Sequence, residues 1–152
     1  MRAVIQRVSS ASVSIGDRVC GRIGNGIAVL LGVEKGDSAE EAELLATKIS
    51  KIRIFSDENG KMNLSASDTG GSFLVVSNFT LIADYSKGNR PSFFGAEEPE
   101  KAEFLYRYFC EFLRNTGFHV ETGVFGVDML VSIANDGPVT LVLESAALKK
   151  KK

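Results

Sequence analysis

The chain has few of the side chains from which metal centres and strong nucleophiles are built. Its 152 residues include one histidine, His119, and two cysteines, Cys20 and Cys110. A metal cluster needs several such ligands at close spacing, so the sequence predicts no metal centre built on histidine or cysteine. A lone histidine also disfavours a Ser-His-Asp hydrolase, and we expect His119 to be structural or solvated. The two distant cysteines are predicted to be free thiols in a reducing cytoplasm.

Long apolar runs are missing as well. There is no stretch of 18 apolar residues, and residues 1–7 lack the apolar centre and cleavage site of a signal peptide. We therefore expect no membrane span and a cytoplasmic location. The sequence also lacks a Gly-x-Ser-x-Gly elbow, a Walker loop and a dinucleotide-binding glycine pattern. Any catalysis must then rely on hydroxyl groups, main-chain dipoles or groups of the substrate itself.

Excess positive charge is absent from the body of the chain. Lysine and arginine total 18 against 19 acidic residues, and four of the 18 form the run Lys149 to Lys152. Residues 1–148 thus carry 14 basic and 19 acidic side chains. This balance argues against a broad basic surface for a nucleic-acid duplex, but it permits a small patch that grips the end of a strand. The lysine run is predicted to be a disordered tail, 149–152.

The pattern of apolar residues predicts one α/β domain over residues 1–148. Residues 1–33 alternate as strands, and the continuous apolar run 27–33 is typical of a central strand covered on both faces. Helices are predicted over about 38–53, after a Ser38–Glu41 capping box, and over about 99–115. Residues 63–71 are predicted to be loop. We expect mostly antiparallel, curved β layers with the two main helices packed on one side.

The segment Asn135-Asp136-Gly137-Pro138-Val139-Thr140 lies between two strand-like runs. Its turn-forming residues predict a hairpin corner. Proline removes a main-chain donor at the point where the second strand should begin. A Gly-Pro bond can also be cis at a cost of only about 0.5–1 kcal/mol, which would direct main-chain atoms where an ordinary turn cannot. The segment is therefore a candidate for a role beyond turning the chain.

A second polar segment, Ser77-Asn78-Phe79-Thr80, follows the buried strand predicted at 73–76. Polar side chains at the end of a rigid strand are a common way to present a site, and main-chain N–H groups there could stabilise an oxyanion. Strand-end capping explains the same residues without a site. Lys87 and Arg90, in a predicted exposed loop over 84–94, could bind phosphate or be plain surface charges. Phe125 and Met129 could line a pocket or fill core.

Taken together, these segments resemble the D-aminoacyl-tRNA deacylase family, also described as D-tyrosyl-tRNA(Tyr) deacylases. Residues 77–81 resemble its Ser-Gln-Phe-Thr-Leu motif, and residues 135–140 match its Asn-x-Gly-Pro-x-Thr motif. Residues 1–8, 87–93 and 121–129 also resemble the family. The resemblance covers nearly the whole chain, and several ordered matches are far more specific than one.

The resemblance implies a homodimer that hydrolyses the ester between a D-amino acid, or glycine, and the 3′ end of tRNA. It implies active sites at the dimer interface and no metal or organic cofactor. Gly137-Pro138 would be cis and reach into the partner's pocket, with Arg7 helping to hold it. Ser77, Asn78, Phe79 and Thr80 would surround the ester and the terminal adenosine. Phe125 and Met129 would border the amino-acid pocket, and Lys87 and Arg90 would bind tRNA.

One departure from the family concerns Asn78, which replaces glutamine and is one methylene shorter. It keeps the amide donors and acceptor but reaches less far, which puts rate or substrate range in question more than reaction type. Two alternatives follow. One is a related deacylase with relaxed selectivity toward L-aminoacyl-tRNA. The other is a non-catalytic nucleic-acid-associated module, which the lysine tail would suit and the acidic body disfavours.

Overall fold

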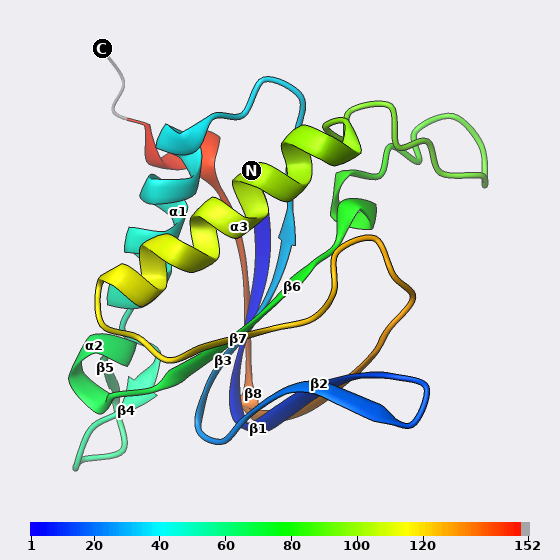
Figure 1. Cartoon of the computed structure of the whole chain (residues 1–152). Helices are drawn as coiled ribbons and strands as arrows, with labels where there is room; N and C mark the ends of the chain where they lie inside the picture. Colours follow the sequence, from blue (N-terminus) through cyan, green and yellow to red (C-terminus); the bar gives the residue numbers. More distant parts are fainter. Residues whose placement is uncertain (150–152) are drawn as a thin grey trace.

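The computed structural model describes residues 1–149, which form eight strands and three α-helices (Figure 1). In chain order the elements are β1 (Arg2–Ile15), β2 (Arg18–Ile23), β3 (Gly26–Gly32), α1 (Ala39–Lys51), β4 (Phe55–Ser56), β5 (Met62–Leu64), α2 (Ala66–Thr69), β6 (Ser72–Ser77), the 3₁₀ turn η1 (Phe79–Ile82), α3 (Pro99–Asn115), β7 (Val120–Thr122), β8 (Leu130–Glu144) and the 3₁₀ turn η2 (Ser145–Leu148). The two main predicted helices are α1 and α3. The predicted lysine tail lies, beyond Lys149, outside the described residues.

The long strand β1 organises the main sheet. Its first half pairs antiparallel with β3, its second half pairs antiparallel with β2, and β8 pairs antiparallel along its other edge. β6 joins β3 in parallel and β7 joins β6 in parallel. Parallel neighbours need crossover connections, and here these contain α1 and α3. The sheet is therefore mixed, with antiparallel pairing dominant as predicted.

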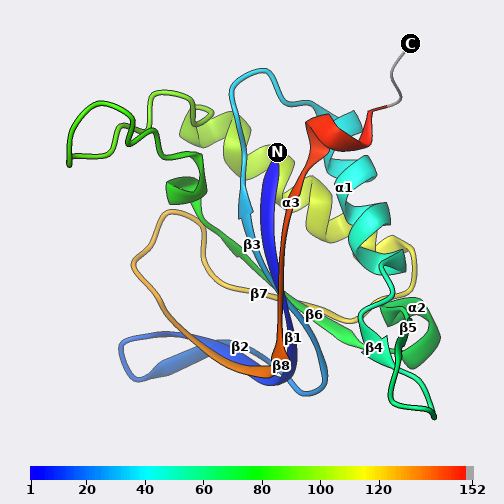
Figure 2. The same cartoon turned by 180° about the vertical axis from the view of Figure 1, so that it is seen from behind.

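Both long helices pack on the same side of this sheet (Figures 1 and 2). They bury one large core against it, whose fully buried side chains include Ile5, Leu45, Ile49, Phe73 and Phe109. The second half of β1 curls with β2 and the first half of β8 over the opposite face. That layer encloses a smaller core, which contains Val8, Val13, Ile23, Leu74 and Val76. The arrangement confirms the predicted order of one helical and two β layers.

The start of α1 follows the predicted capping chemistry. Ser38 accepts a hydrogen bond from the main-chain N–H of Glu40, and the Glu41 carboxylate accepts from the main-chain N–H of Ser38 at 2.7 Å. Burial would raise the pKa of Glu41, but the Lys149 ammonium and Ser38 bonded to its carboxylate lower that pKa to about 2. Glu41 therefore ties the end of the described chain to the first turn of α1.

The predicted loop over 63–71 is wrong in part. Residues 62–64 form β5, which pairs with β4, and Ala66–Thr69 form the short helix α2. Ser65 and Asp68 make a second capping box, with the Ser65 N–H donating to Asp68 Oδ2 at 2.8 Å. The box satisfies main-chain donors locally, so this polar segment forms ordered structure without a long apolar face.

The predicted hairpin corner at residues 135–140 is also wrong. β8 continues through the segment and is paired with β1 on both sides of it, from Ser14↔Leu130 to Arg2↔Glu144. Between the pairs Gln6↔Thr140 and Val8↔Asn135, Arg7 alone stands opposite four residues, 136–139. The segment is thus a wide bulge in one continuous strand, and its Gly137-Pro138 bond is cis, as expected. We refer to residues 136–139 as the β8 bulge.

Candidate active site

A cavity of about 840 Å³ opens where β6 ends, and we refer to it as the β6 cavity. Its size falls within the range of roughly 300–1,000 Å³ that is common for ligand pockets. Four segments surround it, namely the end of β6, the loop that leads into α3 with the start of that helix, the connection between β7 and β8, and the connection between β3 and α1. Its lining residues include Ser77, Asn78, Phe79, Phe93, Phe125 and Met129. Residues from four parts of the sequence therefore converge here.

The Ser77–Thr80 segment lies at the cavity because it continues directly from β6, whose residues 73–76 are buried in the sheet. The N–H of Asn78 donates to the Leu31 carbonyl at 2.8 Å, which extends the contact with β3 by one residue. The chain then turns through η1. A Cβ on Gly32 would lie 3.1 Å from the Asn78 carbonyl oxygen and 3.0 Å from Ile82 Cδ1, so glycine allows this close passage. The segment is held by the sheet rather than by its own side chains.

Within the segment, the Thr80 hydroxyl donates a hydrogen bond to the side-chain oxygen of Asn78. Asn78 lines the cavity, whereas Thr80 is exposed and is not among the lining residues. Phe79 is 58% exposed and packs edge-to-face against Phe93, with ring centres 5.0 Å apart. These two rings form an aromatic wall of the cavity.

Phe125 and Met129 belong to the β7–β8 connection and line the same cavity. The N–H of Val124 donates to Met129 Sδ at 3.3 Å, and the ring of Phe125 lies 6.0 Å from that of Tyr106 on α3. A Cβ on Gly123 would lie 2.5 Å from Met129 Sδ, so only a glycine at this position leaves room for the methionine side chain. Phe125 and Met129 thus line the same cavity as Ser77, Asn78 and Phe79.

Arg7, Gly137 and Pro138 lie elsewhere on the same chain. The Arg7 Nε donates to the Asp136 carbonyl at 3.1 Å, and its Nη1 donates to the Ile54 carbonyl at 2.8 Å. The Asn135 amide donates to the carbonyls of Arg7 and Val139, both at 3.0 Å. These bonds clamp the base of the β8 bulge, while Gly137 and Pro138 are exposed. Neither of these two is among the residues that line the β6 cavity of their own chain.

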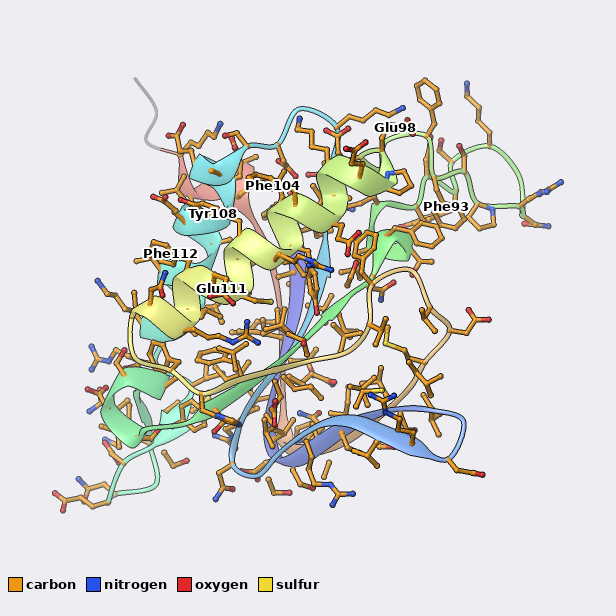
Figure 3. All side chains as sticks on the ribbon, viewed as in Figure 1. Phe93, Glu98, Phe104, Tyr108, Glu111 and Phe112 are labelled. Atoms are coloured by element: carbon orange, nitrogen blue, oxygen red, sulfur yellow. The ribbon has the colours of Figure 1, made fainter. Side chains whose placement is uncertain are left out.

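Lys87 and Arg90 are exposed in the loop over 84–94, as predicted, but they do not line the cavity. The sequence reasoning missed Lys35, Phe93, Phe94 and Glu97, all of which do. Figure 3 shows Phe93 and Glu98 near the same end of α3, whereas Phe104, Tyr108 and Phe112 lie along the helix itself. Two adjacent phenylalanines in an otherwise polar loop were the signal that could have revealed this wall.

The titratable groups near the cavity do not include a strong base or nucleophile. A hydrogen bond from Lys101 lowers the pKa of Glu97, so this carboxylate stays ionised. Away from the cavity, burial in the core raises the pKa of the Cys110 thiol to about 12, which leaves it unreactive. In residues 1–149 no cluster of three or more His, Cys, Asp or Glu side chains could hold a metal ion. Among the same residues, none of the helices has the length and apolarity needed to cross a membrane.

The site thus combines a side-chain amide, hydroxyl groups and an aromatic wall around one cavity. Comparison with known proteins shows the family to which the chain belongs. The sequence model of the family described as D-Tyr-tRNA(Tyr) deacylase matches residues 4–144. The D-aminoacyl-tRNA deacylase of Anaeromyxobacter dehalogenans is 53% identical over 97% of this chain and 99% of that protein. That of Chloroflexus aurantiacus is 57% identical over 98% and 93%. The chain belongs to the D-aminoacyl-tRNA deacylase family and is a hydrolase.

Two solved structures are also similar. One, titled "c-Myc DNA Unwinding Element Binding Protein", is 44% identical, with a TM-score of 0.90 over 95% of this chain and 98% of that one. The other, titled as a probable eukaryotic D-amino acid tRNA deacylase, is 18% identical, with a TM-score of 0.76 over 93% and 97%. The second similarity shows a shared fold. The layered β architecture is therefore common to chains of widely different sequence.

Proposed function

We propose that the chain hydrolyses the ester between a D-amino acid, or glycine carried by tRNA(Ala), and the 3′ end of tRNA. It acts as a cytoplasmic homodimer that proofreads translation. One observation carries the proposal: the two polar segments typical of the family form separate clusters on one chain. The Ser77–Thr80 segment lines a cavity, whereas the β8 bulge is clamped and exposed at a distance. A second copy of the chain would bring the two together.

Asn78 is the group best suited to stabilise the reacting ester. Its side-chain oxygen is occupied by the Thr80 hydroxyl, so its NH₂ group remains free to donate. An amide donor aimed at the ester carbonyl stabilises the negative charge that develops there when water attacks. We assign this role to Asn78, with main-chain N–H groups of the same segment assisting. Ser77 and Phe79 shape the cavity around the ester and the adenosine.

Thr80 is assigned a positioning role. Its hydroxyl donates to an amide oxygen, which is not a base and cannot activate it as a nucleophile. The single histidine lies elsewhere, beside Glu121, with His119 Nε2 at 3.6 Å from that carboxylate. An aminoacyl ester is already activated, so an oriented water and the ribose 2′-OH suffice for attack. The amino-acid side chain would lie against Phe125 and Met129.

Chirality is assigned to main-chain atoms of Gly137-Pro138 from the partner subunit. A pocket that accepts many D side chains cannot select by side chain, but a main-chain wall beside the α-carbon can exclude the L arrangement. Gly137 has no Cβ, which permits close approach. β8 pairs only with β1 among the described strands, so its outer edge is open to a second copy. Leu130 and Val142 on that strand are 68% and 66% exposed.

The test is hydrolysis by the purified protein of D-tyrosyl-, glycyl- and L-tyrosyl-tRNA under one set of conditions. The same samples are sedimented at the assay concentration. We expect turnover of the D and glycyl substrates by a dimer. Comparable turnover of the L substrate would favour the relaxed deacylase that the shorter Asn78 left open. Binding of tRNA without turnover would favour the non-catalytic module, and an active monomer would refute the shared site.

Lys87 and Arg90 are assigned to tRNA contacts outside the cavity. They are the basic residues of the loop over 84–94, and this loop also carries the cavity-lining Phe93. At this position they would meet parts of the acceptor end that the cavity does not enclose. The acidic balance of residues 1–148 makes such local contacts more plausible than a broad basic face.

A further inference from the structure

An exposed cation–aromatic pair stands at the β6 cavity. Lys35 Nζ lies 3.9 Å from the centre of the Phe94 ring, and both residues line the cavity. Phe94 is 82% exposed, the highest value among the large apolar side chains that the structure describes. Lys35 comes from the connection between β3 and α1, and Phe94 from the loop that leads into α3. The pair therefore joins two segments about 60 residues apart in sequence.

Main-chain pairing sets the position of both residues. The N–H of Lys35 donates to the Gly95 carbonyl at 2.9 Å, and the N–H of Glu97 donates to the Val33 carbonyl at 3.0 Å. Glu34 and Ala96 form a bridge between these bonds. The two segments thus run together as a short ladder at the end of the sheet. Lys35 and Phe94 are held beside the cavity by the scaffold, not by their own contact.

The charges around the pair are unequal. Lys35 is the one basic side chain among the described residues that line the cavity, where Glu97, Glu98 and Asp128 are acidic. Glu97 is occupied by the Lys101 ammonium at 2.9 Å. Within residues 1–149, no carboxylate lies within 4.0 Å of Lys35 Nζ. The ammonium is therefore available to an anion that enters from outside.

The contact with Lys35 does not explain why the Phe94 side chain is exposed to solvent. The ammonium covers one region of the ring, and most of the side chain stays exposed. Exposed aromatic rings next to a positive charge are the features that bind single-stranded nucleic acid, because any base can stack on a ring while the cation meets the backbone. A stacking surface at this position continues the Phe79–Phe93 wall to the outside of the cavity.

We propose that Lys35 and Phe94 bind the nucleotide that precedes the terminal adenosine of the aminoacyl-tRNA. Its base stacks on Phe94, and Lys35 pairs with the phosphate that links it to the adenosine. This inference rests on the proposed function, because it takes the adenosine and its ester to occupy the cavity. It also fits a chain whose residues 1–148 are acidic overall, because a contact to the single-stranded end, beside those assigned to Lys87 and Arg90, needs no broad basic surface.

The experiment compares two substrates that share the reacting ester. D-tyrosyl-tRNA carries the preceding nucleotide, and D-tyrosyl-adenosine lacks it. For Phe94→Ala and Phe94→Leu, we expect the KM for the tRNA to rise by about 5- to 100-fold, the range given by one lost stack. The KM for the nucleoside should change several-fold less. Phe94→Trp should restore tRNA binding, because it keeps a flat ring.

Lys35→Ala should raise the KM for the tRNA and lower the slope of its salt dependence by about 0.7, the value for one phosphate contact to a single strand. Lys61→Ala is the matched control. Lys61 is an exposed lysine in the turn between β4 and β5, at the opposite end of the molecule from the loop over 84–94 (Figure 1). Lys61→Ala should change neither the KM for either substrate nor the slope of the salt dependence.

The outcomes separate this inference from the proposed function. A wild-type protein that hydrolyses neither substrate would overturn both. Suppose that the wild-type protein hydrolyses both substrates. If the Lys35 and Phe94 variants then raise the KM equally for the tRNA and the nucleoside, or for neither, the nucleotide site alone is overturned. A penalty specific to the tRNA, together with the smaller salt slope, supports it.

Discussion

The β8 bulge and the Ser77–Thr80 segment are both polar interruptions of strands, yet they are built in opposite ways. The bulge is fixed by bonds from Arg7 and Asn135 to main-chain carbonyls, and it lines no part of the β6 cavity. The Ser77–Thr80 segment lines that cavity, and the Thr80–Asn78 contact is internal to it. The exposed residues of the bulge face away from their own chain, whereas Ser77, Asn78 and Phe79 face the cavity. This difference fits the proposed dimer, in which the β8 bulge of one subunit enters the β6 cavity of the other.

The largest expected effect comes from Gly137→Ala in the β8 bulge. A Cβ there would lie 2.9 Å from the Val139 N and 3.1 Å from Arg7 Nη2, at a φ of +134°. The bulge must shift, and a displacement near 1 Å in a catalytic geometry can cost on the order of 100-fold in rate. We expect kcat/KM for D-tyrosyl-tRNA to fall by about that factor.

Gly16→Ala is the matched control for this change. Gly16 also has positive φ, +54°, but no atom lies within 4 Å of the added Cβ, and the residue sits in the turn between β1 and β2. Both variants should lose some stability in denaturant, because alanine is strained at positive φ. Retained activity in Gly137→Ala would show that the bulge does not form part of the site.

A smaller effect is expected from Thr80→Ala in the Ser77–Thr80 segment. The change removes the hydroxyl that orients Asn78, and we expect a loss of about 10- to 100-fold in kcat. Thr80→Ser keeps the hydroxyl and should recover most of the activity. Denaturing mass spectrometry during turnover should detect no aminoacyl group on the protein. Detection of one on Thr80 would replace the positioning role with covalent catalysis.

The clamp itself can be loosened through Asn135→Ala. Two main-chain carbonyls, of Arg7 and Val139, then lose their donor, and loss of such bonds in partly buried positions costs about 1–3 kcal/mol. We expect that loss in urea unfolding, together with a fall in activity smaller than for Gly137→Ala. Ser132→Ala, an exposed change on the same strand, should alter neither quantity. An Asn135→Ala protein with unchanged stability would mean that the clamp is not what holds the bulge.

Glu41→Gln provides a destabilised reference distant from both segments. The pKa of Glu41 in the folded protein, about 2, lies below its ordinary value of 4.5, so its ionised form stabilises the fold. That contribution is complete above about pH 4.5 and disappears as the pH falls toward 2. We expect unfolding at pH 7 to require less urea in the variant, and the difference to vanish near pH 2. Activity per folded molecule should stay at the wild-type level, which separates stability from function in the variants above.

The parts of the fold that local chemistry determines were predicted correctly. Ser38 and Glu41 mark the start of α1, and the apolar steps along 102–112 mark α3. Ser65 and Asp68 carried the same kind of capping signal, but the polar composition around them favoured a loop. The β8 bulge was misjudged because its residues are turn formers. The strand continues past these residues because it is paired with β1 on both sides of them, and a local pattern does not contain that pairing.

The candidate site was predictable to the extent that it follows motifs. Ser77, Asn78, Phe79, Phe125 and Met129, all taken from motifs, line one cavity, and their roles there stay a prediction. Lys35 and Phe94 were missed because their proximity depends on the bridge between Glu34 and Ala96, a pairing across about 60 residues. A lysine after a strand and a phenylalanine in a loop carry no sign of each other in the sequence.

The pairing of β8 with β1 also has a consequence for how the protein is made. It joins residues 2–14 to residues 130–144, so the two ends of the chain form one ladder. β1 can find β2 and β3 early in synthesis, but its second edge waits until almost the whole chain has left the ribosome. During that interval the nascent protein exposes an unpaired edge next to apolar side chains, which is the surface that chaperones bind and that aggregates grow from. A ribosome that stalls before residue 130 would leave this edge open for good.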